Sequence, residues 1–177
     1  TPVIMGILNV TPDSFSDGGS YASVDEAVAA GLKMVEEGAL LIDVGGESTR
    51  PGASPVSIEE ELARVEEVVR RLAAEGVCVS IDTRHAEVAK ACVEAGASVI
   101  NDVTGFRDPE MVRVATSCDA GLVVMHMQGD DPRTMQDEPH YDDVVDEVAS
   151  YLKNRAELLE QVGVCLLYTS PSPRDRS

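Results

Sequence analysis

The sequence predicts an α/β fold of the TIM (β/α)8 barrel type, here an incomplete barrel of about five strand-helix units. Short, unbroken apolar runs alternate with segments of helical period, which is typical of parallel strands buried on both faces and joined by helices. Every apolar run ends in polar residues, and five polar strand ends would converge at the mouth of a barrel. An open doubly wound sheet instead concentrates its site at one or two strand ends, and no Gly-x-Gly-x-x-Gly follows the first run.

The apolar runs and periodic segments give the expected elements in order. The strands are expected at Val3 to Leu8, Leu40 to Val44, Val77 to Ile81, Ser98 to Ile100 and Leu122 to Met125. The helices are expected over residues 24–35, 58–72, 86–95, 109–117 and 142–161.

Capping signals mark the start of the first two helices. Ser23 stands three residues before Glu26, and Ser57 stands three residues before Glu60, which is the spacing of a capping box. We therefore expect these helices to begin beside the two serines, and to end at the glycine that follows each periodic segment.

Length, composition and charge limit the class of protein. The 177 residues suit one domain, and the formal net charge of −18 argues against a nucleic-acid or anionic-membrane partner. No apolar run approaches ~18 residues and no secretory signal pattern is present, so a soluble, cytoplasmic protein without a membrane span is expected. Cys78, Cys92 and Cys118 show neither close pairing nor zinc spacing, and are expected to be buried, reduced thiols.

The polar strand ends lie within longer motifs that resemble the dihydropteroate synthase family over residues 1–164. The motifs are Met5-Gly-Ile-Leu-Asn-Val-Thr-Pro-Asp-Ser-Phe-Ser-Asp-Gly-Gly, Asp43-Val-Gly-Gly-Glu-Ser-Thr-Arg-Pro-Gly, Ile81-Asp-Thr-Arg, Ile100-Asn-Asp-Val and Met125-His-Met-Gln-Gly. The resemblance implies the eight-stranded barrel. It also implies the condensation of 6-hydroxymethyl-7,8-dihydropterin pyrophosphate with p-aminobenzoate, which gives 7,8-dihydropteroate and pyrophosphate in folate biosynthesis. Mg²⁺ is the implied cofactor, and a homodimer is the implied state of the full-length parent.

Three residues are expected to act in catalysis. Asn9 offers a neutral oxygen at the end of the first strand, and by resemblance it holds Mg²⁺ and pyrophosphate; its simpler interpretation is an ordinary turn residue. Thr49 and Arg50 follow two glycines, and a hydroxyl beside a planar cation suits a departing phosphate. On a chain of this charge an anionic substrate needs such a cation, although a solvated surface arginine is the alternative.

Seven residues are expected to bind substrate. Asp82 and Asn101 end the third and fourth strands, and the resemblance assigns them to the pterin, whereas helix capping is their common alternative. Val103 and Met125 would contact the flat pterin, or could be ordinary core residues. By resemblance, Asp13 organises the first loop, while Phe15 and Pro51 line the p-aminobenzoate pocket.

The remaining polar residues near the strand ends are expected to have structural roles. His126 has no partner at metal-ligand spacing, so a structural role is preferred, and His85 is expected to be an exposed loop or helix-end residue. Asp43, Glu47 and Asp102 are expected to orient loops, with metal binding as the less favoured alternative.

The C-terminal segment departs from the rest of the chain. Residues 165–177 are expected to be a non-native or disordered tail behind a domain of residues 1–164, because Cys165 to Asp175 resembles one reading frame of a transposon-end sequencing adaptor. The later motifs of the family, Asp-Pro-Gly, Ser-Arg-Lys and Arg-x-His, are missing from the sequence. We therefore expect an active full-length parent, and little or no activity from this chain alone.

Two other functions remain open from the sequence. The pterin-binding domain of a folate-dependent methyltransferase shares the fold and the strand-end Asp and Asn, but has no reason to carry Asn-Val-Thr-Pro-Asp-Ser-Phe and Ser-Thr-Arg-Pro-Gly. A non-catalytic pterin-binding protein would need neither pyrophosphate nor Mg²⁺.

Overall fold

Strands and helices alternate strictly along the chain. The computed structural model describes residues 3–11, 20–47, 55–127, 129 and 140–164. The elements are β1 (Met5–Asn9), α1 (Ser20–Glu36), β2 (Leu41–Gly45), α2 (Ile58–Ala74), β3 (Val79–Asp82), α3 (Ala86–Glu94), β4 (Val99–Asp102), α4 (Pro109–Thr116), β5 (Gly121–Val124) and α5 (Val144–Gln161). No helix in these ranges is long and apolar enough to cross a membrane.

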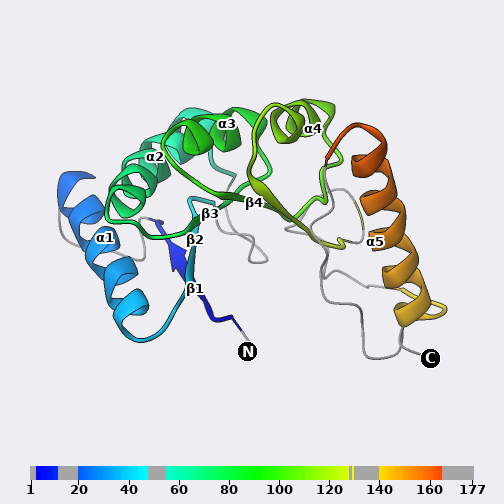
Figure 1. Cartoon of the computed structure of the whole chain (residues 1–177), viewed down its shortest axis with the longest axis horizontal. Helices are drawn as coiled ribbons and strands as arrows, with labels where there is room; N and C mark the ends of the chain where they lie inside the picture. The colour runs from blue at the N-terminus through cyan, green and yellow to red at the C-terminus, as the bar shows by residue number, and fades with distance from the viewer. Residues whose placement is uncertain (1–2, 12–19, 48–54, 128, 130–139, 165–177) are drawn as a thin grey trace.

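The five strands form one parallel sheet in the order β1-β2-β3-β4-β5. The helices follow one another in an arc along the outside of this sheet (Figure 1). Each strand thus pairs with the next along the chain, as in a barrel, and the sheet has β1 and β5 as its two edges. The predicted incomplete barrel is confirmed. We call the sheet face away from the helices the concave face.

The core lies between the sheet and the helices. Ile42, Ile81 and Ile100 point to this side and are fully buried. The facing stripe of α2 consists of Val65, Val68, Val69 and Leu72, all of them 0% exposed. Burying each such side chain contributes about 1.5–3 kcal/mol, so the apolar stripe read from the sequence is what fixes α2 on the sheet.

The two predicted capping boxes have different outcomes. Ser57 is the N-cap of α2, and its hydroxyl accepts from the backbone N–H of Glu60 at 3.2 Å, as predicted. The prediction for α1 is wrong, because that helix begins at Ser20 and Ser23 lies inside its first turn. A capping-box spacing alone does not stop a helix from extending one turn further back.

Burial on both faces is correct for the central strands and wrong for the edges. All residues of β2 after Leu41 are buried, whereas Ile7 of β1 is 63% exposed and every residue of β5 is only partly buried. The helices cover one face of the sheet, so the edge strands expose their concave side.

The cysteine prediction is also correct only in part. Cys92 is buried in α3 and Cys118 is partly buried, but Cys78 is exposed. Cys78 directly precedes β3, which begins at Val79, so it lies at the end of the sheet instead of within it.

Replacing Leu72 by Ala should destabilise the chain by about 2–5 kcal/mol, because it leaves a cavity in a fully buried site. Leu40→Ala is the matched control: Leu40 is 65% exposed, and its loss should change stability by less than about 0.5 kcal/mol. Urea unfolding of both variants measures the difference, and equal losses would contradict the assigned core.

Ile7→Lys should weaken self-association of the chain. Ile7 of edge strand β1 is 63% exposed, Ile4 directly before the strand is 60% exposed, and exposed apolar edges favour pairing between molecules. Sedimentation velocity over a concentration series measures the effect, with Val145→Lys on α5 as control, since Val145 is equally apolar and 67% exposed. A wild-type chain that stays monomeric at every concentration would show this expectation to be wrong.

Candidate functional site

Four strands end in one row on the concave face. The register pairs Asn9 with Gly45, Gly45 with Asp82, and Asp82 with Asn101. The residue before each of them points to the helices and is buried; these residues are Leu8, Val44, Ile81 and Ile100. Because side chains alternate along a strand, the side chains of Asn9, Asp82 and Asn101 face the concave side.

Gly45 leaves a gap between two oxygen atoms of this row. A Cβ added to Gly45 would lie 3.4 Å from Asp82 Oδ2 and 3.7 Å from Asn9 Oδ1. Both oxygens therefore border the same position, at which the chain has no side chain. The gap could admit a ligand group or a cation that prefers oxygen ligands.

A buried hydrogen bond lies beside the row. Asn101 Nδ2 donates to Asp43 Oδ2 at 3.0 Å, and the two residues are 7% and 4% exposed. Asp43 Oδ1 and Asn101 Oδ1 have no hydrogen-bond partner among the described residues, and the same holds for the hydroxyl of Ser80 on the strand between them. The concave face thus holds buried polar groups with spare capacity.

Asp82 titrates far from its ordinary range. Burial raises its pKa to about 7, and the carboxylate of Asp43 is the next largest cause. Smaller repulsions come from Glu61, Asp102 and Glu47. Near neutral pH a large fraction of Asp82 is protonated, so this carboxyl group can accept or donate a hydrogen bond to a ligand.

The loop after β2 is held at its start by two arginines. Arg84 binds Glu47 with two hydrogen bonds, from Nε to Oε2 at 2.9 Å and from a terminal nitrogen to Oε1 at 3.1 Å. Arg64 donates to the backbone oxygen of Gly46 at 2.7 Å. Burial alone would raise the pKa of Glu47, but the hydrogen bond and charge of Arg84 outweigh it and hold that pKa below its usual value. Glu47 therefore orients a loop, as predicted.

A second ion pair lies next to the first. His85 Nδ1 is 2.5 Å from Glu61 Oε2, and this hydrogen bond raises the pKa of His85 despite the partial burial of its ring. His85 is the N-cap residue of α3, so it is a helix-end residue, but the expectation of an exposed ring is wrong because its side chain is only 20% exposed. The sequence signal for Glu61 was weak, since a glutamate in a charged helix normally faces solvent.

Glu47, Glu61 and His85 have ligand atoms within 4.8 Å of one another, as a metal site requires. The charges argue against a metal ion at this place. Arg84 already neutralises Glu47, and the raised pKa of His85 favours its charged form beside Glu61. We therefore interpret the cluster as two ion pairs that join α2, α3 and the loop after β2.

Asp102 shapes the loop after β4. Its carboxylate accepts from the backbone N–H groups of Thr104 and Phe106, both at 2.8 Å, and from the Thr104 hydroxyl. Phe106 has φ 59°, a left-handed conformation that a buried phenylalanine rarely adopts, and the bond to Asp102 stabilises it. Asp102 is thus a loop-orienting residue, as predicted. Val103, in the same loop, is 6% exposed.

His126 packs between two tyrosines. Its ring lies 5.0 Å from Tyr151 of α5 in an edge-to-face arrangement and 5.9 Å from Tyr141. Tyr151 also accepts from Arg107 Nε at 3.0 Å and donates to the backbone oxygen of Thr104 at 3.2 Å. These contacts support the structural role preferred for His126. Neither Arg107 nor Tyr151 carried a sequence signal, because the contacts between them span 44 residues.

Met125 directly follows β5 and is 37% exposed, so it can contact a ligand. Five other predicted site residues lie outside the described residues. They are Asp13, Phe15, Thr49, Arg50 and Pro51. The structure therefore brings together Asn9, Asp82 and Asn101, and it says nothing of the two loops that carry the other five.

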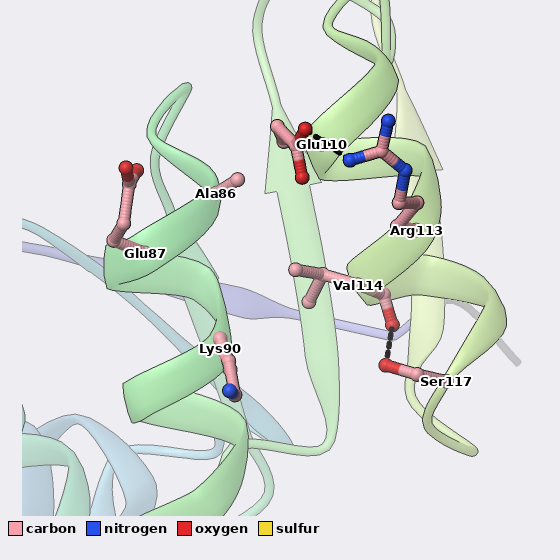
Figure 2. A pocket seen from close by; sticks show the side chains of 7 residues that line it. All are labelled: Ala86, Glu87, Lys90, Glu110, Arg113, Val114 and Ser117. Carbon is pink, nitrogen blue, oxygen red and sulfur yellow. Dashed lines mark hydrogen bonds and ion pairs between the residues drawn. The ribbon is translucent and has the colours of Figure 1, made fainter.

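A surface groove lies elsewhere, between helices α3 and α4 (Figure 2). Its lining includes Lys90 of α3, and Arg113 of α4, which pairs with Glu110. These helices cover the outer side of the sheet, so the groove is separate from the concave face. We assign no role to it.

Comparison with known proteins gives consistent matches. The family described as "Pterin binding enzyme" matches residues 5–166. Dihydropteroate synthase from Escherichia coli strain K12 is 48% identical over 164 residues, which are 92% of this chain and 58% of that protein. The chain thus spans less than two thirds of the length of that relative.

Solved structures of dihydropteroate synthases are also similar to this chain. Burkholderia cenocepacia dihydropteroate synthase, complexed with 7,8-dihydropteroate, has a TM-score of 0.81 and 45% identity, over 93% of this chain and 55% of that chain. Xanthomonas albilineans dihydropteroate synthase with 4-aminobenzoic acid has a TM-score of 0.84 and 50% identity, over 93% of this chain and 58% of that chain.

Asp82→Asn should make the chain more stable at pH 8 than the wild type. The folded-state pKa of Asp82, about 7, lies above its unfolded value of 3.8, so the folded state holds the proton more tightly and wild-type stability falls as pH rises from about 4 to 7. The amide variant lacks this loss. The stability gain of the variant should be larger at pH 8 than at pH 5.5, by about 2 kcal/mol. Urea unfolding at both values tests this, with exposed Asp119→Asn as control; a pH-independent difference would contradict the buried-acid assignment.

Proposed function

This chain belongs to the pterin-binding enzyme family, and from that premise we propose that the whole protein is a dihydropteroate synthase. It would condense 6-hydroxymethyl-7,8-dihydropterin pyrophosphate with p-aminobenzoate and release 7,8-dihydropteroate and pyrophosphate. The row of Asn9, Asp82 and Asn101 at the strand ends carries the proposal, because it puts polar groups where a barrel enzyme binds substrate. The synthase relatives with bound 7,8-dihydropteroate and 4-aminobenzoic acid support it.

Asp82 and Asn101 are proposed to recognise the pterin. They are register partners on β3 and β4, so their side chains lie side by side on the concave face. A carboxyl group and an amide can satisfy the amino and ring N–H groups of a guanidine-like edge. Val103 and Met125, in the segments that follow β4 and β5, would pack against the flat ring system.

The two loops are proposed to hold the other substrate groups. Thr49 and Arg50 would bind the pyrophosphate, since a guanidinium matches phosphate oxygens and the chain is otherwise strongly acidic. Phe15 and Pro51 would enclose p-aminobenzoate, and Asp13 would organise the first loop. The contacts of Arg64 with the Gly46 backbone and of Arg84 with the Glu47 side chain support this assignment, because they hold the start of the loop that carries Thr49 and Arg50.

Magnesium is proposed as the cofactor, with Asn9 as its protein ligand. The donor atoms suit it: Asn9 Oδ1 borders the side-chain-free position at Gly45, and Mg²⁺ prefers oxygen ligands while keeping several waters. When bound, the ion would neutralise negative charge on the pyrophosphate.

The reaction needs positioning more than a protein nucleophile. The nitrogen of p-aminobenzoate would form a bond to the pterin methylene carbon while the bond from that carbon to the pyrophosphate oxygen breaks, and the amine then loses a proton. An arylamine is already a free nucleophile. Asp82 and Asn101 would fix the pterin, and Arg50 would stabilise the charge of the departing pyrophosphate.

Location and assembly are further proposals. Free Cys92 and Cys118 suit a reducing compartment, which supports a cytoplasmic enzyme. A homodimer is proposed on the family resemblance alone.

Calorimetry with the pterin pyrophosphate should show binding that Mg²⁺ strengthens. Asn9→Ala should remove most of the Mg²⁺ effect, while Asn154→Ala on the exposed side of α5 should not. Affinity that is the same with and without Mg²⁺ would favour the non-catalytic pterin-binding protein over a synthase.

The 177-residue chain should form little or no dihydropteroate when supplied with both substrates and Mg²⁺. In the described part of the chain, β1 does not pair with β5, so the barrel is open. Strands β1–β5 therefore line only one side of the site around Asp82 and Asn101. The Escherichia coli synthase serves as the positive control. Substantial synthesis by this chain would show that the open sheet suffices.

A further inference from the structure

The bond between Asp43 and Asn101 is a contact on the concave face that the proposed function does not use. Asp43 lies on β2 and Asn101 on β4, so the 3.0 Å hydrogen bond crosses β3. Both side chains are more than nine-tenths buried. The bond therefore ties one of the two pterin-recognising residues to a strand that contributes neither of them.

This bond determines which way the Asn101 amide points. An ionised carboxylate can only accept hydrogen bonds, so the atom of Asn101 that faces it has to be the nitrogen. A flipped amide would press two acceptors together and lose the bond. Asn101 Oδ1 is thereby directed away from Asp43, and it has no partner among the described residues.

We propose that Asp43 is a positioning residue: it locks the side-chain amide of Asn101, so that Asn101 Oδ1 and the carboxyl group of Asp82 stand side by side for a planar ligand edge with adjacent N–H groups. Asp43 need not touch the ligand. The inference rests on the proposed function, because an amino group beside a ring N–H is the edge that a pterin presents. The contribution of Asn101 to ligand binding then depends on a residue two strands away.

A purely structural role explains Asp43 less well. Its neighbours Ile42 and Val44 are 0% exposed and pack against the helices, whereas Asp43 places a buried charge on the opposite face. Its Oδ1 atom is buried without a partner in the described part of the chain, which costs free energy. An apolar residue at this position would not have that cost. A buried carboxylate kept in this way suggests a task beyond packing.

Variants of Asp43 separate the hydrogen bond from the charge. Asp43→Asn keeps an acceptor for Asn101 Nδ2 and nearly the same shape, whereas Asp43→Ala removes the acceptor. Asp119→Asn changes the same charge at an exposed position before β5 and serves as control. The readout is the pair of side-chain amide signals of Asn101 in ¹H–¹⁵N NMR spectra of the chain, assigned with Asn101→Asp.

We expect the Asn101 signals to be preserved in Asp43→Asn and in the control, and lost or averaged in Asp43→Ala. The affinity for 6-hydroxymethylpterin, measured by titration, should fall about tenfold in Asp43→Ala and stay within about threefold in Asp43→Asn. A merely structural residue would lower the melting temperature of Asp43→Ala without changing either readout. Unchanged Asn101 signals in a folded Asp43→Ala would overturn the proposal.

The wild-type chain gives a test that needs no variant. One side-chain amide proton of Asn101 should exchange with solvent far more slowly than those of exposed Asn154; equal rates would also overturn the positioning role, even if Asp43→Ala fails to fold. Pterin binding is judged separately. If 6-hydroxymethylpterin binds no form of the chain, the proposed function is contradicted, while the amide signals still decide the role of Asp43.

Discussion

Parallel pairing in a single register is the constraint on which the rest of the structure depends. Because Asn9, Gly45, Asp82 and Asn101 are successive register partners, three separate segments of sequence deliver polar side chains to one row, and a fourth contributes a glycine. The residue before each polar end is buried against the helices. The same alternation of side chains thus builds the core on one face and the candidate site on the other. A shift of one residue in any strand would exchange the two faces.

The site gathers negative charge, and nearby ion pairs offset part of it. Asp82 lies among other carboxylates, which together with burial raise its pKa to about 7. Arg84 neutralises Glu47, and His85, whose pKa is raised, forms a hydrogen bond with Glu61. The arrangement reduces stability at neutral pH, but it keeps a carboxyl group that can carry a proton at the place where a pterin would bind. Such a cost to stability is common at functional sites.

The order and type of the five strands and five helices in the described part of the chain could be predicted from the sequence, because unbroken apolar runs alternate with segments of helical period and the apolar stripes decide the packing. The start of α1 could not, since a capping-box spacing fits inside a helix as well as at its end. The exposure of Ile7 depends on which strands are edges, and no local pattern contains that information. The convergence of Asn9, Asp82 and Asn101 could be predicted, because strand ends meet at one edge in parallel sheets. The partner of Asn101 was not found, because Asp43 lies 58 residues away in the sequence.

A map of backbone amide shifts on addition of 6-hydroxymethylpterin would test whether the strand ends on the concave face form the binding site. We expect the largest changes at the ends of β1, β3 and β4, around Asn9, Asp82 and Asn101. We expect no changes along the groove between α3 and α4 (Figure 2). Shifts that cluster at Lys90 and Arg113 in that groove, with the strand ends unchanged, would contradict this expectation.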